Sequence, residues 1–313
     1  MKTHEKLRVA VIQYAPVAFD IENTMIKLET LARAASDKGV KLAVFPEAFI
    51  SAYPKGLDFG SVIGGRTQGG REDYKRYYDS AIAVPGPQTD QLAALSTELS
   101  MNMVIGVIEK DGGTLYCTAV FFDPEGGYLG KHRKLMPTAG ERLVWGFGDG
   151  STMPVYNTAI GKLGAVICWE NYMPAMRLAM YKKGIELYCA PTADNRPSWA
   201  PSMQHIAVEG RCFVLSACQF LKRSDCPDDY NAIQGNDPET VLMSGGSCIV
   251  SPYGAFLAGP TFDCEAILVA DIDLGEITRT KYDLDVVGHY ARPDIFKLIV
   301  DESPKESVSF RRV

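Results

Sequence analysis

The stretch LGAVICWENYMP (residues 163–174) changes character halfway along its length. Leu163 to Ile167 is a continuous apolar run of the length of a buried strand. Pro174 then favours the first turn of a helix, because proline lacks the amide hydrogen that this turn leaves unpaired. Cys168 therefore lies where a strand turns toward a helix, and the pattern predicts an α/β fold.

Strands and helices alternate on both sides of this stretch. Toward the C-terminus we expect helices at 173–183 and 198–210 and strands at 187–190 and 213–218. Toward the N-terminus we expect a strand at 7–13, a helix at 20–38 that Gly39 ends, and a strand at 41–45. Because a helix connects the two N-terminal strands, they should lie parallel in one sheet.

Antiparallel hairpins interrupt this alternation. A helix at 89–100 is followed by strands at 103–109, 115–122 and 128–131, with Gly- and Asp-rich turns between the strands. Further strands are expected at 246–250, 255–258 and 266–271, whereas the Gly- and Tyr-rich residues 53–78 show little periodicity. No linker or repeat divides the chain, so we predict one layered domain over 1–290 and a polar C-terminal tail over 291–313.

Net charge narrows the range of partners. With 32 Lys and Arg against 38 Asp and Glu in 313 residues, the net charge is −6. The long-range field of such a protein repels nucleic acids and anionic membranes. No apolar run approaches the ~18 residues that a membrane helix requires. A small neutral or hydrophobic molecule is therefore the expected partner, with no nucleic acid and no membrane.

The cysteines and the N-terminal residues indicate a location. Eight cysteines are scattered through apolar segments without the spacing of a metal site. The N-terminal residues lack the long apolar run and cleavage site of a signal peptide. We expect a reducing, cytoplasmic setting in which the thiols stay free.

Three polar residues follow predicted strands. Glu47 lies in VFPEAF (44–49), where an acid among apolar neighbours is either a half-exposed loop residue or has a partner or a catalytic role. Cys168 is either a nucleophile activated near a helix N-terminus or an inert core thiol like the other cysteines. Lys134 lies in the basic run KHRKLMP (131–137), which is a solvated face unless one lysine turns inward beside a carboxylate and a thiol.

Two further sequence features do not indicate a phosphate-binding loop or a metal site. The glycines from Gly146 to Gly150 follow no strand-to-helix pattern, so a phosphate-binding loop is not expected. The four histidines are dispersed, and neither HExxH nor CxxC occurs. We therefore predict neither a metal site nor a cofactor.

Taken together, Glu47, Lys134 and Cys168 resemble the Glu-Lys-Cys triad of the carbon-nitrogen hydrolase superfamily in their order, gaps and surrounding sequence. The resemblance covers about residues 7–296. Four stretches resemble the nitrilase branch in particular: CWENYMP (168–174), ERLVWGFGDGS (141–151), APTAD (190–194) and GHYARP (288–293). A departure is Ser51-Ala52 before YPKG (53–56), where relatives often carry Gly-Gly; it leaves the triad untouched but could alter the pocket wall.

This resemblance implies a four-layer α-β-β-α sandwich with mixed sheets. It also implies a nitrilase that converts an organic nitrile into a carboxylic acid and ammonia through thioimidate and thioester intermediates on Cys168. Glu47 would take the thiol proton, and Lys134 would stabilise the negatively charged intermediates. Glu141 matches a second glutamate of the family and would orient Lys134 or the water.

Other functions share parts of this pattern. An amidase, a carbamoylase or a cyanide-converting enzyme of the same superfamily would carry the same triad. A catalytically silent scaffold would keep the fold without the chemistry. A thiol redox sensor is disfavoured, because no second cysteine lies next to Cys168 in the sequence.

The resemblance also predicts a substrate pocket and an assembly. Tyr53, Trp169, Thr192 and Trp199 lie near predicted strand ends and could form a partly aromatic wall, although Tyr53 and Trp199 could equally be core residues. Nitrilase relatives form dimers that extend into spirals, and the tail after Ala291 resembles segments that cross between subunits. We expect a homo-oligomer.

Overall fold

Strand β1 (Leu7–Gln13) shows how the layers are organised in this computed structural model, which describes residues 6–306, 308 and 310. Val9 and Val11 point into a core that also contains residues of a second sheet, among them Leu187. Ala10 and Ile12 point the other way, into a core shared with helix α1 (Ile21–Ser36). Successive side chains of a strand face opposite sides, so this central strand is buried on both faces.

Two mixed sheets form the middle of the molecule. The first has the order β15-β1-β2-β5-β6-β7, and the second has the order β12-β13-β11-β10-β9-β8, with β14 paired to β13. The strands of the first sheet not yet given are β2 (Leu42–Val44), β5 (Asn102–Asp111), β6 (Thr114–Asp123), β7 (Gly127–Arg133) and β15 (Ala266–Ile272). Those of the second are β8 (Val155–Thr158), β9 (Gly161–Ala165), β10 (Leu187–Thr192), β11 (Phe213–Cys218), β12 (Phe220–Lys222), β13 (Val241–Val250) and β14 (Phe256–Phe262).

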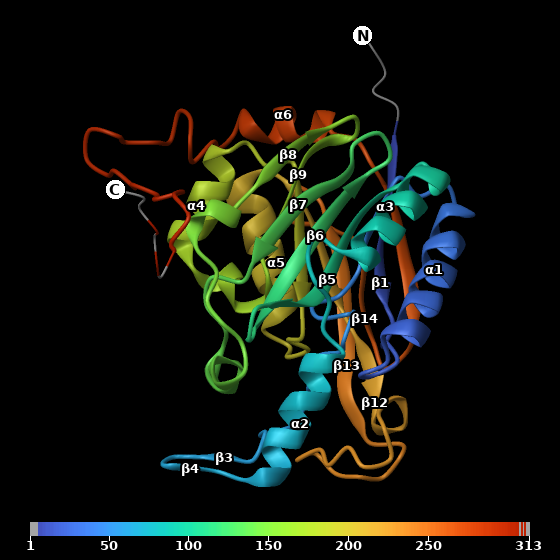
Figure 1. The fold of residues 1–313 in the computed structure, drawn as a ribbon. Helices are drawn as coiled ribbons and strands as arrows, with labels where there is room; N and C mark the ends of the chain where they lie inside the picture. Colours follow the sequence, from blue (N-terminus) through green and yellow to red (C-terminus); the bar gives the residue numbers. More distant parts are fainter. Residues whose placement is uncertain (1–5, 307, 309, 311–313) are drawn as a thin grey trace.

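Helices cover the outer face of each sheet, as Figure 1 shows. Helix α1 and helix α3 (Pro87–Leu99) pack on the first sheet. Helices α4 (Pro174–Lys182) and α5 (Trp199–Gly210) pack on the second. The fold is therefore the four-layer α-β-β-α sandwich that the resemblance implied.

Most of the predicted topology is confirmed. Strands β1 and β2 are parallel, as are β9, β10 and β11. Strands β5, β6 and β7 form the expected antiparallel meander. Helix α1 begins after Asp20, whose carboxylate accepts a hydrogen bond from the Asn23 amide at 2.9 Å, and Gly39 follows with a φ of +77°. These elements follow from local sequence signals.

Residues 53–78 are more ordered than their sequence predicts. They contain a short hairpin, β3 (Ser61–Val62) with β4 (Gly65–Arg66), and most of helix α2 (Gln68–Asp79). This helix buries only Gly70 and Tyr77, so it has almost no apolar stripe to reveal it. In Figure 1 the hairpin and α2 project from one end of the sandwich. The sequence analysis also did not predict three other elements: helix α6 (Gly275–Lys281) and strands β8 and β12.

The described residues after α6 form neither helix nor strand. They return to the body near α4, where Lys183 pairs with Glu302. The Lys305 amide also donates to Asp149 Oδ2 at 2.8 Å. The boundary between a domain over 1–290 and a tail over 291–313 stays a prediction. Within the described part of the chain, no helix has both the length and the apolar character needed to cross a membrane.

Candidate active site

A tight loop after β2 positions Glu47. Gly106 on β5 lies directly beneath this loop, and a Cβ atom there would lie only 2.2 Å from the Pro46 carbonyl oxygen. Glycine therefore lets the loop rest on the neighbouring strand. From the side of the second sheet, the side-chain amide of Gln219 donates to the Glu47 carbonyl oxygen at 2.9 Å. The Glu47 side chain is fully buried.

Lys134 follows directly after β7. Its amide donates to the Cys117 carbonyl oxygen of β6 at 2.8 Å, which continues the sheet pairing by one residue. Its side chain is fully buried, and the Nζ atom lies 5.4 Å from the centre of the Trp145 ring. The sequence left two interpretations open, a solvated basic face or a lysine that turns inward. In the structure Lys134 turns inward.

Cys168 lies on the turn between β9 and α4. Its φ of +49° is in the left-handed region, which few residues with a side chain adopt. The Asn171 side-chain amide donates to the carbonyl oxygens of Val166 and Cys168, at 2.9 and 2.7 Å, and thereby holds the turn. The Thr192 hydroxyl donates to the Cys168 sulfur at 3.2 Å.

The Lys134 ammonium joins the buried carboxylate of Glu47 to the partly buried carboxylate of Glu141. Its Nζ atom lies 2.7 Å from Glu47 Oε1 and 2.7 Å from Glu141 Oε2. Glu141, in the short helix η1 (Ala139–Leu143), also accepts hydrogen bonds from the Thr138 amide at 2.6 Å and the Tyr53 hydroxyl at 2.7 Å. Glu141 is therefore in contact with Lys134, and its role in orienting this lysine stays a prediction.

The Glu47 carboxylate has one occupied and one free oxygen. Oε1 accepts from Lys134 and from the thiol of Cys117, whose sulfur lies 3.4 Å away. Oε2 is buried and has no hydrogen-bond partner among the described residues. A buried carboxylate oxygen without a donor binds a proton more readily than one that accepts several hydrogen bonds.

Burial and charge set the resting protonation states. Burial raises the pKa of the Cys168 thiol well above its usual range, and Glu47 adds to this rise while Lys134 opposes it. Burial also raises the pKa of Glu47, against the opposing charge of Lys134. For Lys134, burial lowers the pKa, but the surrounding negative groups outweigh it and raise the pKa. Cys168 therefore rests as a thiol, so a base must remove its proton as it attacks.

A cavity of about 240 Å³ opens above this cluster. The residues that line it are Tyr53, Lys55, Thr138, Glu141, Cys168, Trp169, Ala193, Asp194, Asn195 and Arg196. Tyr53 and Trp169 thus belong to the wall, whereas Thr192 contacts the Cys168 sulfur without lining the cavity. Trp199 does not belong to the lining: it is buried in the core of the α5 layer, and its indole donates to Ser216 Oγ at 2.8 Å.

The wall is more polar than its aromatic residues alone suggested. Asp194 accepts the indole N–H of Trp169 at 2.8 Å and forms an ion pair with Arg196 at 2.6 Å. The Arg196 guanidinium lies 4.6 Å from the centre of the Trp169 ring. This chain of contacts fixes Trp169 at the mouth of the cavity, where its side chain remains about two-fifths exposed.

Sequence reasoning missed Cys117, Gln219 and Lys55. Cys117 is one of several cysteines in apolar strands, and nothing in its local sequence distinguishes it. Lys55 and Asp194 do lie inside the YPKG and APTAD stretches, so those motifs were the available signal.

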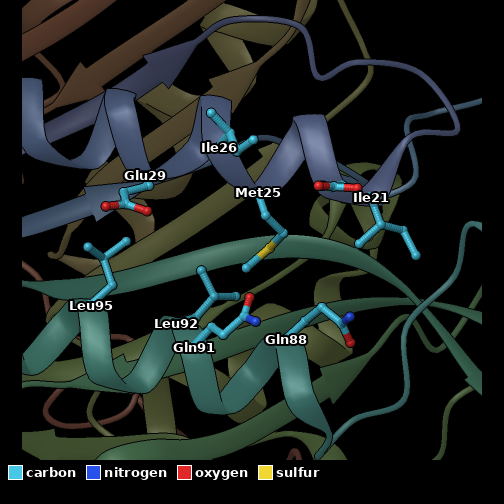
Figure 2. A pocket seen from close by; sticks show the side chains of 9 residues that line it. Ile21, Met25, Ile26, Glu29, Gln88, Gln91, Leu92 and Leu95 are labelled. Carbon is cyan, nitrogen blue, oxygen red and sulfur yellow. The ribbon is translucent and has the colours of Figure 1, made fainter.

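The molecule has other hollows that are remote from this chemistry. One groove of about 620 Å³ runs between α1 and α3, and Figure 2 shows the side chains that line it, including Met25 and Leu92. It contains none of the three candidate catalytic residues. The smaller cavity at Cys168 is the candidate active site, because a thiol lines it together with the Glu141 carboxylate that pairs with the Lys134 ammonium.

Comparison with known proteins agrees with this geometry. The carbon-nitrogen hydrolase family model matches residues 8–282, which include the loop of Glu47, the end of β7 and the Cys168 turn. The chain belongs to the carbon-nitrogen hydrolase family. Within this family, an aliphatic nitrilase from Sinorhizobium fredii is 58% identical over 98% of this chain and 99% of its own length. A bifunctional nitrilase/nitrile hydratase from Nicotiana tabacum is 54% identical over 97% of this chain and 88% of its own length.

These relatives place the chain in the nitrilase branch of the carbon-nitrogen hydrolase family. Among solved structures, a carbon-nitrogen hydrolase from Helicobacter pylori has a TM-score of 0.72 at 21% identity, covering 94% of this chain and 97% of its own. An amidase from Nesterenkonia has a TM-score of 0.66 at 19% identity, covering 91% and 96%. At such low identity these two structures establish the shared fold of the carbon-nitrogen hydrolases.

Proposed function

We propose that the protein is a nitrilase that hydrolyses a small organic nitrile to the carboxylic acid and ammonia. The observation that carries this proposal is that Cys168 and Glu141 line one cavity, and that the Lys134 ammonium behind it pairs with both Glu141 and Glu47. The 58% identity with an aliphatic nitrilase favours a nitrile over other carbon-nitrogen substrates.

The first step forms a carbon-sulfur bond. Cys168 attacks the nitrile carbon while its proton passes to Glu47, and Glu47 passes this proton on to the nitrile nitrogen to give a thioimidate. Lys134 stabilises the negative charge that develops in this step. Glu141 holds Lys134 in place by accepting a hydrogen bond from its ammonium group. The Tyr53 hydroxyl in turn holds Glu141, because it donates to the other oxygen of the Glu141 carboxylate.

Two water molecules complete the reaction. The first adds to the thioimidate carbon, and the carbon-nitrogen bond of the resulting tetrahedral adduct breaks to release ammonia and leave a thioester. The second hydrolyses the thioester to the acid and regenerates the thiol. Glu47 takes a proton from each attacking water and returns one to the leaving group.

The same tetrahedral adduct has a second outcome. If the carbon-sulfur bond breaks instead of the carbon-nitrogen bond, the product is the amide. The name of the Nicotiana tabacum relative, a bifunctional nitrilase/nitrile hydratase, makes this outcome a candidate for the present chain. Acid and amide should therefore be quantified together.

A panel of aliphatic, aromatic and arylaceto nitriles, each assayed beside its amide, tests the proposed function. Ammonia release from nitriles that exceeds release from the matched amides supports a nitrilase. Turnover of the amides alone would support the amidase alternative, and turnover of neither would support the silent scaffold. The Cys168→Ala variant gives the background rate.

Trp169 should influence which nitriles are preferred. The Trp169→Ala variant removes a wall of the cavity, so bulky nitriles should gain relative to small ones. One methylene group in a hydrophobic pocket changes the discrimination between two substrates by about 10- to 200-fold. We expect the ratio of kcat/KM for bulky and small nitriles to shift by more than this. Trp199→Phe, which changes a core indole outside the cavity, is the matched control. An unchanged ranking in Trp169→Ala would remove this residue from the specificity wall.

The exposed apolar residues of the tail support an oligomeric state. Ile295, Phe296 and Ile299 are 58%, 78% and 80% exposed, and such a cluster is typical of a surface that another subunit covers. We propose that the tail joins subunits, as the nitrilase resemblance predicts. An interface that does not close on itself would extend dimers into a spiral.

Truncation of the tail tests this assignment. A chain that ends at Asp294 should have a smaller mass in light scattering than the full-length protein. The double substitution Phe296→Ser and Ile299→Ser keeps the tail length and should have the same effect. A monomeric full-length protein would contradict the predicted assembly, and an unchanged large assembly after truncation would assign the contact to another surface.

The cytoplasmic location stays part of the proposal. All eight cysteines are free, and seven of them are buried. Free thiols persist in a reducing compartment, which supports this location.

A further inference from the structure

A buried ion pair lies next to the catalytic residues without lining the cavity. The Nε2 atom of His132, on β7, lies 3.0 Å from Glu170 Oε2, in the short helix η3 (Cys168–Tyr172). Both side chains are fully buried. Burying a charged or polar pair has a large desolvation cost, so its presence beside the site requires an explanation.

Both ring nitrogens of His132 face hydrogen-bond acceptors. Nε2 faces the Glu170 carboxylate, and Nδ1 lies 2.5 Å from the carbonyl oxygen of Thr152. A neutral imidazole carries only one N–H, and its other nitrogen would then face an acceptor with a lone pair. The geometry therefore favours an imidazolium that donates from both nitrogens.

Glu170 accepts hydrogen bonds from the backbone on both sides of the site. Its Oε2 accepts from the Ile167 amide at 2.8 Å, and its Oε1 accepts from the Leu135 amide at 2.6 Å. Ile167 precedes Cys168, and Leu135 follows Lys134. One carboxylate thus connects the backbone that carries the nucleophile with the backbone that carries the ammonium.

We propose that His132 and Glu170 are positioning residues that act as a charged pair to hold the Lys134 segment against the Cys168 turn. This inference rests on the proposed nitrilase function. A misplacement of about 1 Å can slow a reaction by about 10²-fold, so loosening this link should lower kcat. Substrate binding should change little, because neither residue lines the cavity.

The charges around His132 determine how the pair responds to pH. Burial lowers the pKa of His132, but the Glu170 carboxylate and the two hydrogen bonds outweigh burial and raise it. Lys183, the C-cap residue of α4, opposes protonation. Lys183 is itself paired with Glu302 of the tail.

The sign of the effect follows from the raised pKa. A group whose pKa is higher in the folded than in the unfolded protein stabilises the fold fully below its unfolded pKa. That stabilisation is lost as the pH rises through the folded pKa. The pair should therefore be weakened by alkaline pH, and not by mild acid.

The His132→Gln variant tests the pair. Glutamine keeps a donor near Glu170 but cannot carry the charge or reach Thr152 at the same time. We expect kcat to fall by about 10- to 10²-fold, which is the effect expected from a loss of positioning. KM should change less than threefold. The ratio of wild-type to variant kcat should decrease as the pH rises through the pKa of His132. His205→Gln is the matched control, because His205 is exposed and lies on α5.

Thermal unfolding provides a measurement that needs no substrate. The difference in unfolding temperature between wild type and His132→Gln should be largest at mildly acidic pH and should shrink as the pH rises through neutral into the alkaline range. A difference that does not vary with pH would overturn the charged pair and leave His132 a packing residue. If His132→Gln does not fold, His132→Asn, which keeps the donor toward Thr152, replaces it. Absence of nitrile turnover in the wild type would contradict the proposed function alone, since the unfolding comparison would still test the pair.

Discussion

We expect the Cys168→Ala variant to lose nitrile hydrolysis completely while it keeps the fold. Among the described residues, Cys168 is the one cysteine that lines the cavity, and Cys117, whose thiol contacts Glu47, lies on β6 outside the lining. Removing a nucleophile that acts within a catalytic unit can reduce kcat by about 10⁶-fold. The loss should therefore reach the detection limit of an ammonia assay.

The fold should survive for two reasons. The substitution removes one sulfur atom from a buried position. Alanine also keeps the Cβ atom, so the cost of the φ of +49° at this position does not change. Circular dichroism and thermal unfolding would confirm that the variant is folded.

Cys189→Ala is the matched control for Cys168→Ala. It removes an equally buried sulfur atom from β10, outside the cavity, and should keep its turnover. Mass spectrometry of wild type quenched during turnover should find the acyl group on the peptide that contains Cys168. Wild-type turnover in Cys168→Ala, or an adduct on another cysteine, would overturn the mechanism.

The second large effect is expected from Glu47→Gln and Lys134→Met. The first keeps the shape of the side chain but removes the base, and the second removes the ammonium between two carboxylates. Each should lower kcat by orders of magnitude. The double variant should be little worse than either single variant, because residues that act as one unit have non-additive effects.

The two variants should differ in stability. Glu47→Gln leaves Lys134 paired with Glu141, so the unfolding free energy should change little. Lys134→Met leaves the buried Glu47 and the partly buried Glu141 without their cation, and breaking a buried pair costs about 3–5 kcal/mol. Urea unfolding should therefore separate the two variants even though both are inactive.

Lys131→Met is the control for the loss of positive charge. Lys131 lies on the same strand and pairs with Glu109, outside the cavity. Its substitution should leave kcat nearly unchanged. Fully additive losses in the Glu47 and Lys134 double variant would count against a single catalytic unit.

Local sequence patterns were sufficient for most of the framework. The apolar run at 163–167 and the proline at 174 predicted the strand, the turn and the start of α4. Strand and helix periodicity predicted the parallel pairing of β1 with β2. These features depend on neighbours in the chain, which is why the sequence alone could indicate them.

The same patterns failed where an element has little apolar periodicity. Helix α2 buries so few side chains that its sequence resembles a loop. Only the resemblance suggested a catalytic role for Glu47, Lys134 and Cys168, since an inert Cys168 and a solvated Lys134 remained open alternatives on local evidence.

From the residue pattern alone, Glu47, Lys134 and Cys168 could each be placed after a strand. Which side chains meet at these strand ends depends on the packing of the two sheets. The thiol of Cys117 points at Glu47, and Glu170 accepts hydrogen bonds from the backbone beside both Lys134 and Cys168. Trp199 instead turns away into the core. Local periodicity specifies which face of an element is buried, whereas contacts between elements distant in sequence form only when the two sheets pack together.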